Sequence, residues 1–225
     1  MLNKLPIIAA VALSITISGC GNKTTSNDTT ATDTTKTANA TATKSILVFG
    51  DSLTAGYGLD DPSEAYPSVL QTKIDSAKLP YTIVNGGVSG ETSAGGKGRI
   101  DWLLKQRVDI FILELGANDG LRGIPVAETK NNLQAIIDRV KAKYPKAKLV
   151  MLGMQVPPNM GAAYATDFKN IFPTLATKNN MTLVPFLLQG VGGVRALNQK
   201  DGIHPTAAGA KIVANNVWDV MRGIL

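Results

Sequence analysis

Short apolar segments alternate with longer segments of mixed polarity from about residue 45 onward. The short segments are aliphatic and β-branched runs typical of buried strands, and they cover residues 45–49, 81–84, 110–113, 148–152 and 182–184. In the longer segments apolar residues recur every three or four positions, which predicts helices over residues 64–77, 93–106, 125–143, 162–178 and 206–221. Because strands that alternate with helices form βαβ units, we expect an α/β domain. It would be a three-layer sandwich with a central, mainly parallel sheet of about five strands flanked by helices.

The first 44 residues break this pattern and divide into a leader and a tether. A positive start precedes an apolar run over residues 5–17, which is too short to span a membrane comfortably and ends in Ile17-Ser18-Gly19-Cys20. This ending resembles the lipobox of bacterial lipoproteins, which implies a signal peptide over residues 1–19 and lipidation of Cys20. An ordinary secretory leader with an incidental cysteine is the alternative. Residues 20–44 would be the lipidated cysteine and a Thr-rich disordered tether, because this tract has too few apolar residues to fold.

The leader and the composition together limit location and partners. The lipobox implies a domain over residues 45–225 that is lipid-anchored in the bacterial cell envelope through Cys20. Gly21 stands where an aspartate is associated with retention in the inner membrane, which favours the outer membrane and periplasm in a Gram-negative host. The formal net charge is +6, but the Lys and Arg residues are scattered, so we expect no nucleic-acid partner. Cys20 is the only cysteine, which excludes an intrachain disulfide. We expect a monomer.

Small and polar residues follow the first three predicted strands. They form the groups Gly50-Asp51-Ser52, Gly87-Val88-Ser89-Gly90 and Gly116-Ala117-Asn118-Asp119. Because ligands of parallel sheets bind beyond the carboxyl ends of the strands, Ser52 is placed for chemistry, although a helix N-cap is the alternative role. Glycines allow close approach of backbone N–H groups and Asn118 offers an uncharged amide, so these groups could together stabilise an oxyanion.

His204 is the only histidine, so a histidine-assisted nucleophile would have to use it. Asp201 precedes it by three residues, and one local turn could bring the carboxylate to the ring Nδ1 and leave Nε2 for a serine. The alternative is that Asp201 and His204 only cap a helix.

These four groups resemble the four sequence blocks of the GDSL, or SGNH, hydrolases, in the same order and spacing. Gly50-Asp51-Ser52-Leu53, the glycine block ending at Gly90, Gly116-x-Asn118-Asp119 and Asp201-x-x-His204 carry the resemblance, which extends over residues 45–225. It is closest to bacterial periplasmic esterases of the thioesterase/arylesterase/lysophospholipase type, and one departure is Ala117, where that branch often has glycine. No Gly-x-Ser-x-Gly elbow surrounds Ser52, which argues against the common α/β-hydrolase arrangement.

The resemblance implies a flavodoxin-like fold and a serine esterase that works through an acyl-serine intermediate. Ser52 would be the nucleophile, His204 the base and Asp201 its orienting partner, with an oxyanion hole from the Ser52 and Gly90 N–H groups and the Asn118 side chain. It implies no metal ion and no organic cofactor.

The substrate is defined only as a class by the resemblance: aryl esters, short-to-medium acyl esters, thioesters or lysophospholipids. Leu53, Tyr57, Val156 and Pro157 could line its pocket, because they are apolar and follow strands one and four; ordinary core packing is the alternative. Two other functions stay open, an O-deacetylase of an envelope polysaccharide and a non-catalytic binding lipoprotein.

Overall fold

The computed structural model describes residues 43–225, and the predicted signal peptide, lipidation site and nearly all of the tether lie outside them. Five strands form one sheet in the order β2-β1-β3-β4-β5, and every neighbouring pair is parallel. The strands are β1 (Lys44–Gly50), β2 (Tyr81–Gly87), β3 (Ile110–Glu114), β4 (Lys148–Leu152) and β5 (Thr182–Val184). The predicted α/β class and five-stranded parallel sheet are therefore confirmed.

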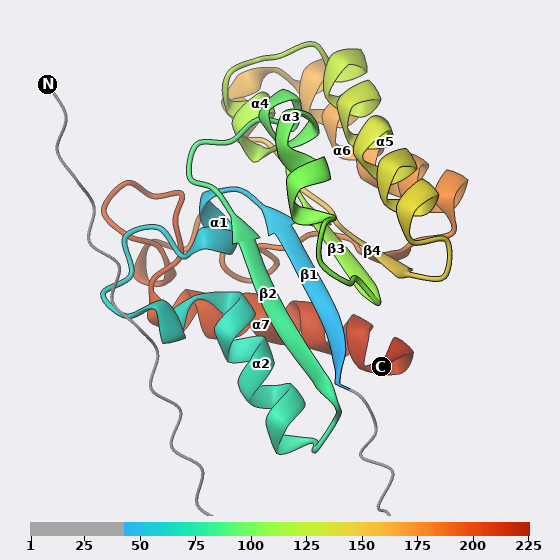
Figure 1. The fold of residues 1–225 in the computed structure, drawn as a ribbon. Helices are drawn as coiled ribbons and strands as arrows, with labels where there is room; N and C mark the ends of the chain where they lie inside the picture. The colour runs from blue at the N-terminus through green and yellow to red at the C-terminus, as the bar shows by residue number, and fades with distance from the viewer. Residues whose placement is uncertain (1–42) are drawn as a thin grey trace, which may run out of the picture. The chain divides into compact units, whose positions relative to one another are not determined.

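Helices cover both faces of this sheet, as Figure 1 shows. The longer helices are α2 (Tyr66–Ser76), α3 (Ser93–Leu103), α5 (Val126–Lys143), α6 (Ala162–Asn179) and α7 (Ala207–Met221). On one face α2 packs against α7, and on the other α5 packs between α3 and α6. Two short helices, α1 (Ser52–Ala55) and α4 (Ala117–Leu121), begin directly beyond the carboxyl ends of β1 and β3. Within residues 43–225, no helix combines the length and the apolar character that crossing a bilayer requires.

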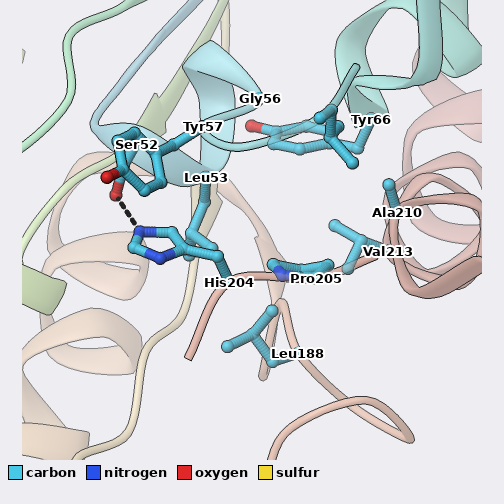
Figure 2. Close-up of a pocket in the computed structure, with 11 residues that line it drawn as sticks. Ser52, Leu53, Gly56, Tyr57, Tyr66, Leu188, His204, Pro205, Ala210 and Val213 are labelled. Carbon is cyan, nitrogen blue, oxygen red and sulfur yellow. Dashed lines mark hydrogen bonds between the residues drawn. The ribbon is translucent and has the colours of Figure 1, made fainter. Parts of the chain in front are cut away.

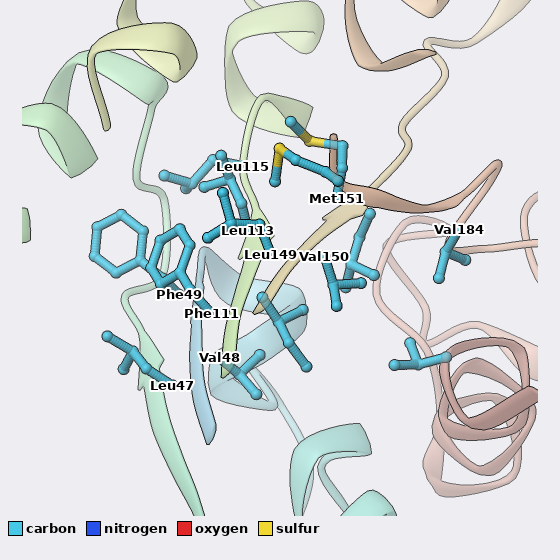
Figure 3. Close-up of a cluster of buried hydrophobic side chains, with 14 of the residues drawn as sticks. Leu47, Val48, Phe49, Phe111, Leu113, Leu115, Leu149, Val150, Met151 and Val184 are labelled. Carbon is cyan, nitrogen blue, oxygen red and sulfur yellow. The ribbon is translucent and has the colours of Figure 1, made fainter. Parts of the chain in front are cut away.

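The core lies on both faces of the sheet. Residues 46–49 of β1 are completely buried, as are residues 111–113 of β3. Figure 3 shows these aliphatic and aromatic side chains packed with those of β4 and β5. Strands that are buried on both faces have continuous apolar sequences, which is why β1, β3 and β4 were visible as short apolar runs, whereas the edge strands β2 and β5 are only partly buried.

The structure changes some element boundaries. Asn85-Gly86-Gly87, predicted as the start of a turn, continues β2 and pairs with residues 48–50 of β1. The helix predicted from residue 64 begins at Tyr66, after a 3-10 turn over Pro62–Glu64. Neither α1 nor α4 was predicted, because four or five residues are too few to show a helical period.

Candidate active site

Ser52 is the first residue of α1, directly beyond the carboxyl end of the central strand β1. The N-cap of this helix is Asp51, whose Oδ1 accepts a hydrogen bond from the backbone N–H of Leu53 at 3.0 Å. The alternative role of Ser52 as an N-cap is therefore wrong, and its hydroxyl is available for another partner.

The partner of Ser52 is His204, from the loop that precedes α7. His204 Nε2 lies 2.9 Å from Ser52 Oγ, and Figure 2 shows this hydrogen bond. On the other side of the ring, Nδ1 lies 2.7 Å from Asp201 Oδ2, and Asp201 Oδ1 accepts from the backbone N–H of His204 at 3.1 Å. The N-cap of α7 is Thr206, so Asp201 and His204 do not cap that helix.

Asp201 is charged at neutral pH. Burial raises the pKa of Asp201, but hydrogen bonds from the His204 ring and from the backbone N–H groups of Ile203 and His204 outweigh it and lower this pKa to about 2. An ionised carboxylate only accepts hydrogen bonds, so it holds the ring proton on Nδ1 and leaves Nε2 free to accept the proton of Ser52.

Gln199 and Tyr57 hold the loop of His204 against the loop of Ser52. Gln199 Nε2 donates to the backbone oxygens of Tyr57 at 2.7 Å and Pro205 at 3.0 Å, and the Gln199 N–H donates to His204 O at 2.7 Å. The Tyr57 ring packs on the His204 ring with centroids 4.7 Å apart. Sequence reasoning placed Tyr57 in the pocket but missed Gln199, whose contacts link segments far apart in the chain.

Gly90 and Asn118 reach the same cleft as Ser52. Gly90 has φ +78°, a conformation that L side chains rarely adopt, although a Cβ there would meet open space. Asn118 Nδ2 donates to the backbone oxygen of Glu91 at 3.0 Å and to Asp51 Oδ2 at 3.2 Å. Gly90 and Asn118 therefore line the cleft into which Ser52 opens, the part of the site where a tetrahedral oxyanion would need amide donors.

A buried polar network lies beneath Ser52. Glu114 Oε2 accepts hydrogen bonds from the Asp51 N–H at 3.0 Å and from Thr54 Oγ1 at 2.7 Å, and the Tyr66 hydroxyl lies 2.9 Å from Thr54 Oγ1. A Cβ at Gly50 would lie 2.1 Å from Thr54 Oγ1, so glycine is required there. One feature of the sequence could have predicted this network: Glu114 directly follows the apolar residues of β3. Sequence analysis assigned it no role.

The pKa values of both carboxyls in this network lie above their usual values. Burial, together with the nearby charge of Asp51, raises the pKa of Glu114 well above its usual value. Burial also raises the pKa of Asp51 to about 6, against the lowering effect of hydrogen bonds from Leu53 and Asn118. The raised pKa favours the neutral form of Glu114, in which it holds the turn before Ser52 without adding a negative charge.

The cleft over these residues has a volume of about 790 Å³. All four predicted pocket residues, Leu53, Tyr57, Val156 and Pro157, line it, as do the apolar side chains of Leu121, Phe186, Leu188 and Ile203, which were not predicted. A second cavity of about 10 Å³, whose lining residues are drawn in Figure 2, is too small for more than a water molecule. The large cleft, mainly apolar with polar groups at Ser52, suits an ester with a hydrophobic part. Within residues 43–225, no three His, Cys, Asp or Glu side chains are arranged to hold a metal ion.

Comparisons with known proteins identify relatives of this chain. Residues 48–212 match the GDSL-like lipase/acylhydrolase family. The chain is 39% identical over 185 residues to the esterase TesA of Pseudomonas aeruginosa, covering 82% of this chain and 90% of that protein. It is 37% identical over 180 residues to a protein of Escherichia coli K12 named thioesterase 1/protease 1/lysophospholipase L1, and the match covers 80% of this chain and 84% of that protein. The crystal structure of TesA superposes with a TM-score of 0.77 at 39% identity, covering 81% of this chain and all of that one.

Proposed function

Because this chain belongs to the GDSL-like lipase/acylhydrolase family and is thus a hydrolase of ester bonds, we propose that Ser52, His204 and Asp201 are its catalytic triad. The observation that carries this proposal is the hydrogen-bonded series from Ser52 Oγ to His204 Nε2 and from His204 Nδ1 to Asp201 Oδ2, at 2.9 and 2.7 Å. Along this hydrogen-bonded series the nucleophile contacts the base, and the base contacts the orienting carboxylate, as the mechanism of serine hydrolases requires.

The reaction has two steps. Ser52 Oγ attacks the acyl carbonyl carbon while its proton passes to His204 Nε2, and the resulting tetrahedral intermediate collapses when His204 returns that proton to the leaving alcohol or thiol. A water molecule then gives a proton to His204 and attacks the carbonyl carbon of the acyl-Ser52 ester. The second tetrahedral intermediate breaks its bond to Ser52 Oγ while His204 returns the proton to that oxygen, which releases the carboxylic acid and restores the serine. Asp201 stays charged through both steps and stabilises the imidazolium that forms twice.

The oxyanion hole in this proposal consists of the Ser52 N–H, the Gly90 N–H and the Asn118 amide. The Asn118 hydrogen bond to Asp51 is long, at 3.2 Å, so Asn118 can exchange it for the developing oxyanion. The bond to Glu91 O, at 3.0 Å, fixes the amide in place during that exchange.

The substrate class in this proposal is an aryl ester, a short-to-medium acyl ester, a thioester or a lysophospholipid. The support is the apolar cleft together with the activities for which the relatives are named, which include those of an esterase and a thioesterase/lysophospholipase. The same names favour this activity over an O-deacetylase of polysaccharides and over a non-catalytic binding protein.

We further propose that the domain acts as a monomeric lipoprotein in the bacterial cell envelope. The support is the Ile17-Ser18-Gly19-Cys20 pattern and the Thr-rich tract that follows it, all within residues 1–44. In a Gram-negative host the lipid on Cys20 would anchor the enzyme to the outer membrane, facing the periplasm.

Labelling with a fluorophosphonate probe tests the nucleophile. The parent protein and Ser89→Ala are expected to react, because Ser89 lines the same cleft but has no place in the triad. Ser52→Ala is expected to stay unlabelled and to lose nearly all hydrolysis of a graded panel of p-nitrophenyl and lysophospholipid esters. Labelling of Ser52→Ala would move the nucleophile elsewhere.

A further inference from the structure

Arg99, on the inner side of α3, makes more polar contacts than the catalytic chemistry explains. Its Nε lies 2.6 and 2.8 Å from the two carboxylate oxygens of Glu91, and its guanidinium also bonds to Glu91 through Nη2. Nη2 donates in addition to the backbone oxygens of Gly86 at 2.8 Å and Gly50 at 3.2 Å. The guanidinium lies over the Phe49 ring, 4.2 Å from its centroid. One side chain thus joins the ends of β1 and β2 to the loop that follows β2.

Glu91 closes the turn that carries Gly90. Its backbone N–H donates to Val88 O at 3.2 Å, and Val88 N–H in turn donates to Gly50 O at 3.0 Å. The Glu91 side chain is only 7% exposed, so its charge depends on Arg99 for compensation. The turn that carries Gly90 is therefore tied to the strand ends through the Glu91–Arg99 ion pair, while Arg122 Nη2 donates to the Gly90 backbone oxygen at 3.0 Å.

Glu91 also fixes the other donor. The Glu91 backbone oxygen accepts from Asn118 Nδ2 at 3.0 Å, which orients the Asn118 amide. A displacement of Glu91 would consequently move both the Gly90 N–H and the Asn118 amide, whereas the hydrogen bonds among Ser52, His204 and Asp201 do not involve it.

We propose that Arg99 and Glu91 are positioning residues that hold the oxyanion hole in shape by clamping the turn over residues 88–91 to the ends of β1 and β2. Neither side chain touches the reacting atoms. The proposal rests on the proposed function, because it assumes that Gly90 and Asn118 stabilise the oxyanion. Misplacing such donors by about 1 Å can cost about 10²-fold in rate, so loss of the clamp should lower kcat and leave substrate binding nearly unchanged.

The test compares Arg99→Met with Arg139→Met in the full chain. Arg139 also contacts α3, through Asp101 at 3.4 Å and the backbone oxygen of Lys97, but on the exposed side. We expect Arg99→Met to lower kcat by about 10- to 10²-fold with KM changed less than about twofold. Its affinity for an aryl boronic acid, which forms a tetrahedral anion on a serine, should fall in parallel. Arg139→Met should match the parent in all three quantities.

Glu91→Gln covers the case in which Arg99→Met does not fold. Glutamine keeps the size and the acceptor oxygen but loses the charge, and a charge-assisted bond is roughly twice as strong as a neutral one, so kcat should fall by about three- to tenfold. The double variant should lose little more than Arg99→Met alone, because both changes open the same clamp. An unchanged kcat in Glu91→Gln, or losses in the two variants that multiply, would overturn the proposal.

Asn118→Ala separates this inference from the function beneath it. A loss of about 10²–10³-fold in kcat is expected for one missing oxyanion donor. If Asn118→Ala shows that loss while Arg99→Met and Glu91→Gln keep the parent's kcat and boronate affinity, the clamp is wrong and the oxyanion hole stands. If Asn118→Ala keeps the parent's kcat, the oxyanion hole itself fails, and the clamp fails with it.

Discussion

Asn118 Nδ2 donates to Asp51 Oδ2 at 3.2 Å, so a proposed oxyanion donor lies directly against a buried carboxyl group. Asp51 has no exposed surface, and burial raises its pKa to about 6. The residue that caps the helix of Ser52 is therefore neutral in mild acid and charged above neutrality, which gives the fold a dependence on pH.

Asp51→Asn should remove that dependence. Because the pKa of Asp51 in the fold lies above its usual value of 3.8, the folded state binds the proton more tightly. The corresponding stability is fully present below pH ~4 and is lost as pH rises through about 6, by at most about 3 kcal/mol. Urea unfolding at pH 4 to 7.5 should show the parent losing free energy of unfolding relative to Asp51→Asn. Asp60→Asn, an exposed control, should follow the parent. A constant difference between parent and Asp51→Asn across this range would contradict the shifted pKa.

Asp201→Asn should keep the fold and lose much of kcat. The amide can accept from His204 Nδ1 or donate to it, and donation holds the ring in the tautomer that cannot take the Ser52 proton; a triad carboxylate replaced in this way costs about 10⁴-fold. Since 38% of the Asp201 side chain is exposed, a water molecule can partly take over the hydrogen bond of the lost carboxylate to His204. We therefore expect a smaller loss in kcat, of about 10²–10³-fold. Steady-state kinetics beside the exposed control Asp101→Asn would measure this. Because the pKa of Asp201 is about 2, its protonation should not limit the parent's rate at pH 4 or above. A parent-like kcat in Asp201→Asn would remove Asp201 from the triad.

Gly90→Ala and Gly98→Ala form a matched pair. A Cβ meets open space at both positions, but Gly90 has φ +78° whereas Gly98 lies within α3. Alanine in place of Gly90 strains the turn by about 1 kcal/mol or more and reorients the backbone N–H of residue 90. Because this N–H is a proposed oxyanion donor, kcat should fall by about tenfold or more. Alanine at Gly98 should raise helix stability by about 0.5–1 kcal/mol and leave kcat alone. Equal kcat values in the two variants would show that the Gly90 N–H is not a catalytic donor.

Cys20→Ser tests the proposed anchor. Cells grown with an alkyne fatty acid should label the parent and Ser52→Ala alike, since lipidation does not need the active site. Cys20→Ser should take up no label and should leave the membrane fraction. Labelled Cys20→Ser protein would contradict the lipoprotein proposal and favour an ordinary secretory leader.

The sequence predicted the strands better than the contacts between them. Each buried parallel strand is an apolar run, so its position is readable without knowledge of its neighbours. Gly86 and Gly87 were wrongly predicted to lie in a turn, because glycine usually marks one. In the structure their small size instead lets β2 run close beside β1 and α1.

The candidate site divides in the same way. Ser52, Gly90 and Asn118 were predictable as neighbours because strand ends of a parallel sheet meet at one rim. His204 was predictable as the partner of a serine because it is the only histidine of the chain. Gln199, Arg99 and Glu91 were missed because their hydrogen bonds join backbone atoms of distant segments, and no local pattern of residue types encodes such contacts. Glu114 was also missed, although a charged residue at the end of a buried strand is unusual enough to have been noticed.

The separation of Ser52 from His204 along the sequence has a consequence for truncated chains. Their hydrogen bond joins residues 152 positions apart, and His204 reaches Ser52 from the segment just before α7, the helix that packs against α2. A chain that lacks its last fifth therefore contains the proposed nucleophile but not the proposed base. In the proposed mechanism, ester hydrolysis requires the segment just before α7 to be present and docked beside Ser52.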